Sequence, residues 1–300
     1  MSHAKSAVIV VSSLVTRGSV GGRGAVFALE RLGFPVWFVP TVWLPWHPGH
    51  GRATRVVTPE AEFAALIDDL IGSKWLGEVG AVITGYFGAP HQVEIAARLI
   101  AAVRQANPAA LHLCDPVIGD RQGEAAGGLY VPEATAIAIR DQLIGSCDIA
   151  TPNAFELGWL TGRDVTTTGE AVAAARALNI ATTIVTSAPA MMTKSAATLL
   201  VTPDDAVQAE HPLSPAAPHG TGDLFAALYL AHRLDGFEPV KALERATASI
   251  FDMIVRSVRA GSDELLIAAE QDVIKHSLAQ VNLRHIAVPR RPPKPAGRPA

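Results

Sequence analysis

Cysteine and strong charge of either sign are scarce in this chain of 300 residues. Cys114 and Cys147 are the only cysteines, too few for a disulfide framework or a thiolate metal site. Lys and Arg together number 25 against 28 Asp and Glu, which gives a formal net charge of −3. This balance lacks the basic excess typical of nucleic-acid-binding domains, so we expect no nucleic-acid partner.

Long apolar runs are also missing. No stretch is long enough to span a bilayer, and the first residues lack the apolar run and cleavage site of a signal peptide. We therefore expect a cytoplasmic protein with no membrane partner. The chain is nevertheless 49% hydrophobic and only 18% charged, which is typical of a globular protein with one large or two modest domains.

Short β-branched runs alternate with helical stretches along the chain. The expected strands are residues 7–11, 36–39, 81–84, 111–114, 148–151, 182–186 and 197–201. Apolar residues spaced by three and four predict helices near 22–32, 59–71, 91–106, 133–144, 154–161, 169–178, 222–234, 239–259 and 263–281. This alternation predicts an α/β fold, with a mainly parallel central sheet and helices on both faces.

The end of the chain has a different composition. Residues 287–300, AVPRRPPKPAGRPA, are Pro-rich and basic and have no apolar period, so we expect a disordered tail. Residues 1–286 contain neither a repeat of fixed period nor an internal linker. We expect them to form one folded domain.

Polar or small residues follow most of the expected strands. In an open α/β sheet, ligands bind outside the carboxyl ends of the strands, so these residues should converge on one rim. The alternative is that they only form turns and cap helices. The residues are Ser12, Ser13, Gly85, Tyr86, Asp115, Pro116, Pro152, Asn153, Thr186 and Ser187.

Two familiar nucleotide signatures are missing. There is no GxxxxGK[ST], which excludes the P-loop mechanism, and GSVGGRG (18–24) does not match GxGxxG. His47 and His50, in HPGH, suggest a metal site only weakly. A Pro-Gly interior rules out a helical pair, and no carboxylate or third histidine is close in sequence. We expect these two histidines to lie in a surface loop.

The segment HGTGDLFAAL (219–228) places two glycines and an aspartate before an apolar helix. The first backbone N–H groups of a helix are unpaired and attract anions, and Gly220 and Gly222 would let a phosphate come close to them. Asp223 adds negative charge at the same point. It is either a helix cap or a base directed at an incoming hydroxyl.

This segment resembles the catalytic segment of the ribokinase-like small-molecule kinases. From about residue 7 to residue 275, the chain is similar to their pyridoxal kinase branch. GTGD indicates the superfamily, whereas TGY, CDPVxGD and TPNxFE together indicate the branch. The motifs occur in family order: SLVTRGSVGGR (13–23), TGYFG (84–88), CDPVIGD (114–120), LYVPE (129–133), TPNAFELGWLTG (151–162), TS (186–187) and GTGDLFAA (220–227).

The resemblance implies an ATP-dependent, Mg²⁺-dependent homodimeric kinase that phosphorylates the 5'-hydroxymethyl group of pyridoxal. It leaves open whether a monovalent cation such as K⁺ takes part, and whether other B6 vitamers are substrates. Asp223 would be the general base, and Gly220, Thr221 and Gly222 would form an anion hole for the transferred phosphate. The substrate would contact Ser13, Tyr86, His47 and Asp223.

The resemblance also implies a nucleotide site at the other end of the rim. Residues 120–130 would form a mobile flap over ATP, and Asp115 and Glu156 would arrange Mg²⁺, mostly through waters. The spacing of Asn153 and Glu156 allows a second interpretation, a helix N-cap with Glu at the third helical position. The implied ATP-binding residues are Asp115, Asp120, Tyr130, Asn153, Glu156, Thr186, Ser187, Thr221 and Gly222.

The chain departs from the family pattern on the vitamin side. Leu14 follows Ser13 where the family often has His, Gly22 stands where it often has Asn, and Pro48 replaces a Thr of an SNHT-like segment. Each change removes a polar contact around the vitamin and none around the phosphate. Two alternatives therefore stay open: a same-fold kinase for another hydroxymethyl heterocycle, such as a hydroxymethylpyrimidine, and a non-catalytic binder of the vitamin or a nucleotide.

Overall fold

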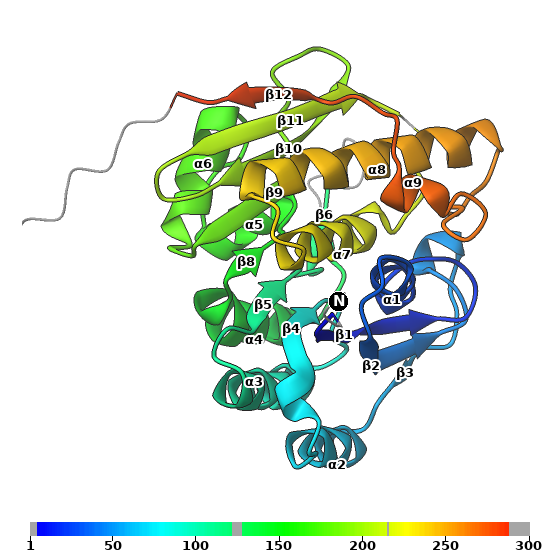
Figure 1. The fold of residues 1–300 in the computed structure, drawn as a ribbon, viewed down its shortest axis with the longest axis vertical. Helices are drawn as coiled ribbons and strands as arrows, with labels where there is room; N and C mark the ends of the chain where they lie inside the picture. Colours follow the sequence, from blue (N-terminus) through cyan, green and yellow to red (C-terminus); the bar gives the residue numbers. More distant parts are fainter. Residues whose placement is uncertain (1–4, 122–127, 215, 288–300) are drawn as a thin grey trace, which may run out of the picture.

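A computed structural model describes residues 5–121, 128–214 and 216–287, and its centre is a ten-stranded sheet (Figure 1). The strand order is β12-β11-β10-β9-β8-β5-β4-β1-β2-β3. The strands are β1 (Ala7–Val15), β2 (Val36–Leu44), β3 (Val56–Val57), β4 (Val79–Thr84), β5 (Leu111–Cys114), β8 (Ile149–Ala150), β9 (Thr182–Ala188), β10 (Ser195–Val201), β11 (Ala206–Pro212) and β12 (Asn282–His285).

The middle of this sheet is parallel and its two ends are antiparallel. Strands β2, β1, β4, β5, β8 and β9 pair in parallel. Strands β10, β11 and β12 extend one end antiparallel, and β3 does so at the other. A separate two-stranded sheet joins β6 (Gly119–Asp120) to β7 (Gly128–Leu129). The predicted mainly parallel α/β sheet is confirmed.

Helices cover both faces of the sheet because its strands are apolar on both sides. In β1, Val8 and Val10 belong to one core and Ile9 and Val11 to another, as the two-residue period of a strand requires. The first face carries α1 (Gly22–Arg31), α7 (Thr221–Leu234), α8 (Pro239–Arg259) and α9 (Asp272–Lys275). The second carries α2 (Glu60–Ile71), α3 (Pro90–Ala106), α4 (Glu133–Ala138), α5 (Ala154–Thr161) and α6 (Thr168–Ala177).

The expected helices are found with one exception, residues 263–281. Within this range the structure has only the short helix α9 (Asp272–Lys275). Ser262 and Glu264 instead form a turn, in which the Ser262 hydroxyl donates to the Glu264 carbonyl and accepts from its amide. Side-chain bonds of this kind compete with helix formation. The helix expected at 133–144 is also shorter, since Ile139–Leu143 forms a π-helical turn.

The sequence pattern also missed strands. The run AVQAEHP forms strand β11. Its apolar pattern is interrupted by Gln208 and Glu210, yet both of these polar side chains are buried in the structure. Strand β1 continues to Val15, so Ser12 and Ser13 lie inside the strand rather than after it. The register with β2 shifts between Ser12 and Leu14, as at a β-bulge.

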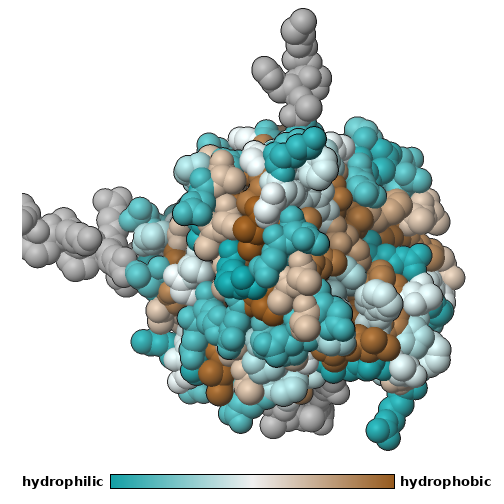
Figure 2. Space-filling model, turned by 90° about the horizontal axis from the view of Figure 1, so that it is seen from below, coloured by the Kyte–Doolittle hydropathy of each residue, from teal (hydrophilic) through white to brown (hydrophobic). Residues whose placement is uncertain are grey.

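The surface seen from below Figure 1 interleaves hydrophilic and hydrophobic residues, with apolar areas separated by polar ones (Figure 2). Among the residues that the structure describes, no helix combines the length and apolarity needed to cross a membrane. The expected tail lies outside the described residues from 288 onward, and so does the central part, 122–127, of the expected flap.

Candidate active site

The carboxyl ends of the parallel strands meet the start of α7 at a small cavity. Its lining includes Ser12 of β1, Gly85 after β4, Asp115 after β5, Gly21 before α1 and Asp223 of α7. The expected convergence of strand-end residues on one rim is therefore confirmed for Ser12, Gly85 and Asp115. The carboxylates of Asp115 and Asp223 thus face the same cavity, whose other lining residues are mostly small.

The GTGD segment forms the first turn of α7. Gly220 is its N-cap residue and has a φ of 89°, a conformation that favours glycine. The Asp223 side chain turns back toward the first glycine-rich turn, where its Oδ2 accepts a hydrogen bond from the Gly21 amide at 2.9 Å. Burial raises the pKa of Asp223 to about 6, against an ordinary 3.8. A carboxylate with this pKa is well placed to accept a proton near neutral pH.

Asp115 is buried at the end of β5 and is held on both sides. Its amide donates to the Thr84 carbonyl at 2.8 Å, and its Oδ1 accepts from the Thr151 hydroxyl at 2.9 Å. Burial raises the pKa of Asp115 well above its ordinary value, and the charges of Asp223 and Glu156 raise it further. Three carboxyl groups therefore lie close enough to influence one another.

Glu156 lies in the first turn of α5 and accepts bonds from the backbone of two segments. Its Oε2 accepts from the Asn153 amide at 2.9 Å, while the Asn153 side chain accepts from the Glu156 amide, so the predicted capping box is present. Its Oε1 accepts from the amides of Ile118 and Gly119 at 2.8 and 3.3 Å. Burial raises the pKa of Glu156 to about 7. Both oxygens are thus engaged by main-chain N–H groups.

A second hollow lies around the start of α5. Asp120, Asn153 and Ser187 line it together with Pro189 and Thr166. The Asn153 amide nitrogen donates to the Gly119 carbonyl at 2.8 Å, and the Thr186 amide donates to the Pro152 carbonyl at 2.9 Å. Three of the predicted ATP-binding residues therefore share one hollow. Asp115 instead lines the first cavity, together with Asp223.

Tyr130 lies near Asp120 at the end of β7, the strand that pairs with β6. Its amide donates to the Ile118 carbonyl at 2.8 Å. Burial raises the pKa of Tyr130, and Asp120 contributes in the same direction. The described ends of the expected flap are thus joined to each other and to the segment that Glu156 holds.

Tyr86 and Ser13, which the sequence predicts to contact the vitamin, lie next to Ser12 and Gly21 of the cavity lining. The Tyr86 amide donates to the Ser12 hydroxyl at 3.3 Å, and its phenol oxygen accepts from Arg55 at 3.2 Å. Ser13 is buried beside Gly21, where an added Cβ would approach the Ser13 Oγ to 2.4 Å. Gly22 opens α1, and an added Cβ there would meet the Phe38 ring at 2.2 Å. The Gly22 departure therefore fits the presence of an aromatic ring at this position.

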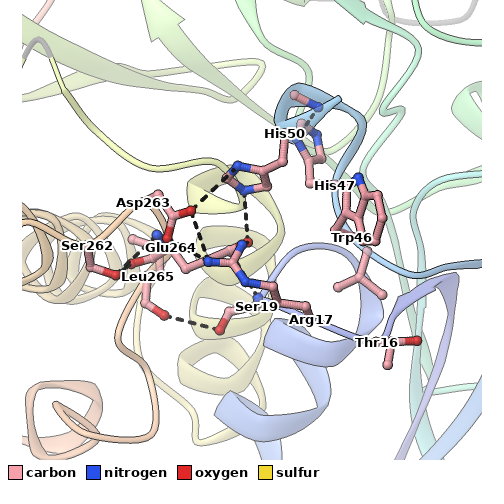
Figure 3. Close-up of polar contacts among 12 residues, drawn as sticks. Thr16, Arg17, Ser19, Trp46, His47, His50, Ser262, Asp263, Glu264 and Leu265 are labelled. Atoms are coloured by element: carbon pink, nitrogen blue, oxygen red, sulfur yellow. Dashed lines mark hydrogen bonds and ion pairs between the residues drawn. The ribbon is translucent and has the colours of Figure 1, made fainter. Parts of the chain in front are cut away.

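His47 and His50 each have a neighbour in space that is distant in sequence. The His47 ring lies 4.2 Å from that of His219, the residue before the GTGD segment. The His50 Nε2 lies 3.0 Å from the Glu264 Oε1, as Figure 3 shows. Burial, and then the neighbouring His219 and His50, lower the pKa of His47 to about 4. The loop position was predicted correctly. A third histidine and a carboxylate, however, do lie nearby in space.

The described residues contain no group of three or more His, Cys, Asp or Glu side chains arranged to hold a metal ion by themselves. Asp115 and Glu156 nevertheless suit a cation that is bound mainly by waters and phosphate oxygens. Mg²⁺ prefers such a shell, with only one or two protein carboxylates. Clustered carboxyl groups with raised pKa values also favour a nearby cation.

Comparisons with known proteins indicate the family of the chain. The family model described as phosphomethylpyrimidine kinase matches residues 60–267. The pyridoxal kinase PdxY of Corynebacterium diphtheriae is 33% identical over 93% of this chain and 99% of its own length. The pyridoxine/pyridoxal/pyridoxamine kinase of Bordetella avium is 36% identical over 87% of this chain and 88% of its own.

The fold has solved counterparts as well. The pyridoxal kinase of Leishmania donovani in complex with ADP and pyridoxine superposes with a TM-score of 0.85, at 27% identity, covering 94% of this chain and 99% of that one. The fold and the rim site define a ribokinase-like small-molecule kinase. The chain belongs to the phosphomethylpyrimidine kinase family and, within it, to the pyridoxal kinases.

Proposed function

We propose that the protein transfers the γ-phosphoryl group of ATP to the 5'-hydroxymethyl group of pyridoxal, giving pyridoxal 5'-phosphate. The observation that carries the proposal is Asp223, a carboxylate with a raised pKa at the N-terminus of α7, facing the same cavity as Asp115. A protein that only binds the vitamin would have no use for a base at this point.

Two parts of the α7 N-terminus divide the chemistry. Asp223 accepts the proton of the substrate hydroxyl as the new P–O bond forms. The amides of Gly220, Thr221 and Gly222 stabilise the negative charge on the phosphoryl group in transit, since they precede the first intrahelical hydrogen bonds. Phosphoryl transfer depends chiefly on positioning and electrostatic stabilisation of this kind. Ser13, Tyr86 and His47 would hold the vitamin.

The nucleotide would occupy the second hollow. Its lining by Asp120, Asn153 and Ser187 supports this placement, and Thr186 and Tyr130 border the same segments. Its terminal phosphate would then point toward Thr221 and Gly222. Asp115 would hold Mg²⁺, with Glu156 acting through water because backbone amides engage both of its oxygens. The ion would supply charge neutralisation on the phosphates.

We also propose a cytoplasmic homodimer. The resemblance to the pyridoxal kinase branch implies the assembly, and the composition of the chain underlies the proposed location. Size-exclusion chromatography with light scattering tests the assembly, and a molar mass of one chain would contradict it.

One assay tests the proposed reaction. Purified protein with ATP and Mg²⁺ is offered pyridoxal, pyridoxine, pyridoxamine and hydroxymethylpyrimidine in parallel. We expect pyridoxal to be phosphorylated with a clear preference over the pyrimidine. EDTA should abolish turnover and added Mg²⁺ should restore it. Faster turnover of the pyrimidine than of every B6 vitamer would favour the alternative substrate, which the Gly22 and Pro48 departures and the name of the family model support.

A further inference from the structure

Glu264 is a buried carboxylate outside the predicted site, and it contacts separate segments of the chain (Figure 3). Its Oε1 accepts from the Nε2 of His50 at 3.0 Å and from the guanidinium of Arg17 at 3.4 Å. Its Oε2 accepts from the Ser19 amide at 3.3 Å. Its backbone also pairs with that of His219 in an isolated parallel bridge. Glu264 therefore joins three segments that are distant from one another in sequence, around Ser19, His50 and His219.

Each of these segments borders the vitamin side of the proposed site. Ser19 belongs to the glycine-rich turn 18–24, whose Gly21 amide binds Asp223. His50 belongs to the loop 45–51, which also carries His47. His219 directly precedes the anion hole, and its ring packs on that of His47. One carboxylate thus fixes the loop 45–51 relative to both the base and the anion hole.

The contact is a close fit rather than a loose surface ion pair. The side chain of Glu264 is only 10% exposed. Gly18 has a φ of 99°, and an added Cβ there would lie 2.3 Å from the Glu264 Oε1. A buried carboxylate is costly unless it is paired and hydrogen-bonded. The neighbouring Asp263 differs: its side chain is 58% exposed, and it binds the same Arg17 at 2.9 Å from the solvent side.

The loop itself presents His47 in a defined state. Its Nδ1 accepts from the Gly49 amide at 3.1 Å, so a neutral ring carries its proton on Nε2 and offers a hydrogen-bond donor. This donor stands in the segment where Pro48 replaces a threonine hydroxyl. Fixing the loop 45–51 therefore also fixes the His47 Nε2–H group, which could donate a hydrogen bond to a vitamin substrate.

We propose that Glu264 is a positioning residue that latches the loop 45–51 over the vitamin side of the site, through His50 and Arg17. This inference rests on the proposed function for its substrate. The latch does not touch the substrate and does not reach the nucleotide hollow. It acts on the affinity for pyridoxal rather than on phosphoryl transfer or ATP binding.

The test compares Glu264→Gln with Asp263→Asn in the full chain. Both variants remove one carboxylate charge from the surroundings of Arg17 and His50, since the Asp263 Oδ2 lies 3.7 Å from the His50 Nδ1. Only the first removes the buried carboxylate that accepts from the His50 Nε2 at 3.0 Å and from the Ser19 amide. We expect Glu264→Gln to raise the KM for pyridoxal about 5- to 30-fold, with kcat and the KM for ATP within about twofold of the parent. Such a change in KM corresponds to roughly 1–2 kcal/mol of binding free energy. Asp263→Asn should leave all three constants within about twofold.

Hydrogen exchange supplies a readout that does not depend on turnover. Peptides covering residues 45–51 should exchange at least about tenfold faster in Glu264→Gln than in the parent, and at the parental rate in Asp263→Asn. His50→Gln is a second variant for the case that Glu264→Gln does not fold, and it should shift the same KM and the same peptides. Combined in one chain, the two substitutions should act less than additively.

The inference is overturned if the loop exchanges at the parental rate in both Glu264→Gln and His50→Gln, or if the KM for ATP rises as much as that for pyridoxal. A parent protein that phosphorylates no B6 vitamer would instead refute the proposed function. The exchange rates would still decide whether Glu264 holds the loop.

Discussion

The Asp223 carboxylate accepts a hydrogen bond from the Gly21 amide, across 202 residues of sequence. The bond links the N-terminus of α7 to the turn before α1, so the orientation of the proposed base is set by main chain. Gly21 has a φ of 67° and little space around its Cα, which confines this position to glycine. A base held in this way needs no side-chain rearrangement before it accepts a proton.

Replacing Asp223 with Asn tests the role of the base. Asn keeps the shape and the acceptor for the Gly21 amide but cannot take the proton of the hydroxyl. We expect kcat for pyridoxal to fall by roughly 10²–10⁴, the usual contribution of positioned proton transfer. The affinity for ATP, measured by equilibrium binding, should stay level or increase because a negative charge beside the phosphates is lost.

Asp235→Asn is the matched control for this substitution. Asp235 follows the same helix at its other end, where it pairs with Lys5 at 2.6 Å on the surface. Its loss should cost at most about 1 kcal/mol of stability and leave turnover unchanged. A folded Asp223→Asn protein with kcat within about threefold of the parent, ~0.7 kcal/mol in the barrier, would contradict the assignment.

The pH dependence of catalysis follows from the same carboxyl group. Its pKa is raised to about 6 in the folded protein, and only the ionised form can act as a base. We expect kcat/KM for pyridoxal to rise tenfold per pH unit below about 6 and to level off above it. A profile that stays flat from pH 5 to pH 8 would exclude Asp223 as the titrating base.

Stability should show the opposite trend over part of this range. Asp223 has an ordinary pKa of 3.8 in an unfolded chain and about 6 when folded, so the folded state binds more protons between these values. Its contribution to the free energy of unfolding therefore falls as pH rises from about 4 to about 6. We expect the melting temperature of Asp223→Asn, relative to the parent, to be higher at pH 7 than at pH 4. An unchanged difference would contradict the raised pKa.

Gly222→Ala separates the anion hole from the fold. An added Cβ at Gly222 meets no atom within 4 Å, and alanine favours helix more than glycine does. The variant should fold with an unchanged or higher melting temperature, yet lose turnover because the methyl group crowds the transferred phosphate. Gly220→Ala is the contrast, since its φ of 89° should make it unstable as well. Full activity in Gly222→Ala would argue against phosphate binding there.

Removing residues 287–300 should change little. A Pro-rich basic segment without an apolar period has little surface to bury. We expect activity to be retained and the melting temperature to change by less than about 4 °C, which corresponds to very roughly 2 kcal/mol at this chain length. A larger drop in differential scanning calorimetry would indicate that the segment packs on the domain.

Local signals predicted much of the fold and the rim. The apolar periods located the parallel strands, and the motifs around Asp115 and Asn153 stood at strand ends, where parallel topology brings side chains together. The motif around Asp223 stood at the start of helix α7. The capping box of α5 was readable because Asn153 and Glu156 lie within one helical turn. These features depend on residues that are close in sequence.

The remaining features depend on partners that are distant in sequence. Glu264 and His50 are 214 positions apart, and only the packing of the 262–265 turn against the first glycine-rich turn brings them together. Strand β11 was missed because Gln208 and Glu210 break its apolar run. Their burial is compensated by bonds such as that from the Met191 amide to the Glu210 Oε1 at 2.6 Å. A periodicity argument does not include such partners.

Strand β12 is an edge strand of the sheet and covers the main-chain edge of β11, although its own residues are exposed. It pairs with β11 through main-chain bonds at Glu210, Ala209, Gln208 and Val207, while all four of its own residues, Asn282–His285, are exposed. A chain shortened to before Asn282 would leave the edge of the buried strand β11 open to pairing with other molecules, the usual route to aggregation. An affinity tag attached after Ala287 would leave the pairing of β12 with β11 intact. The solubility of the protein should therefore depend on whether the chain retains β12.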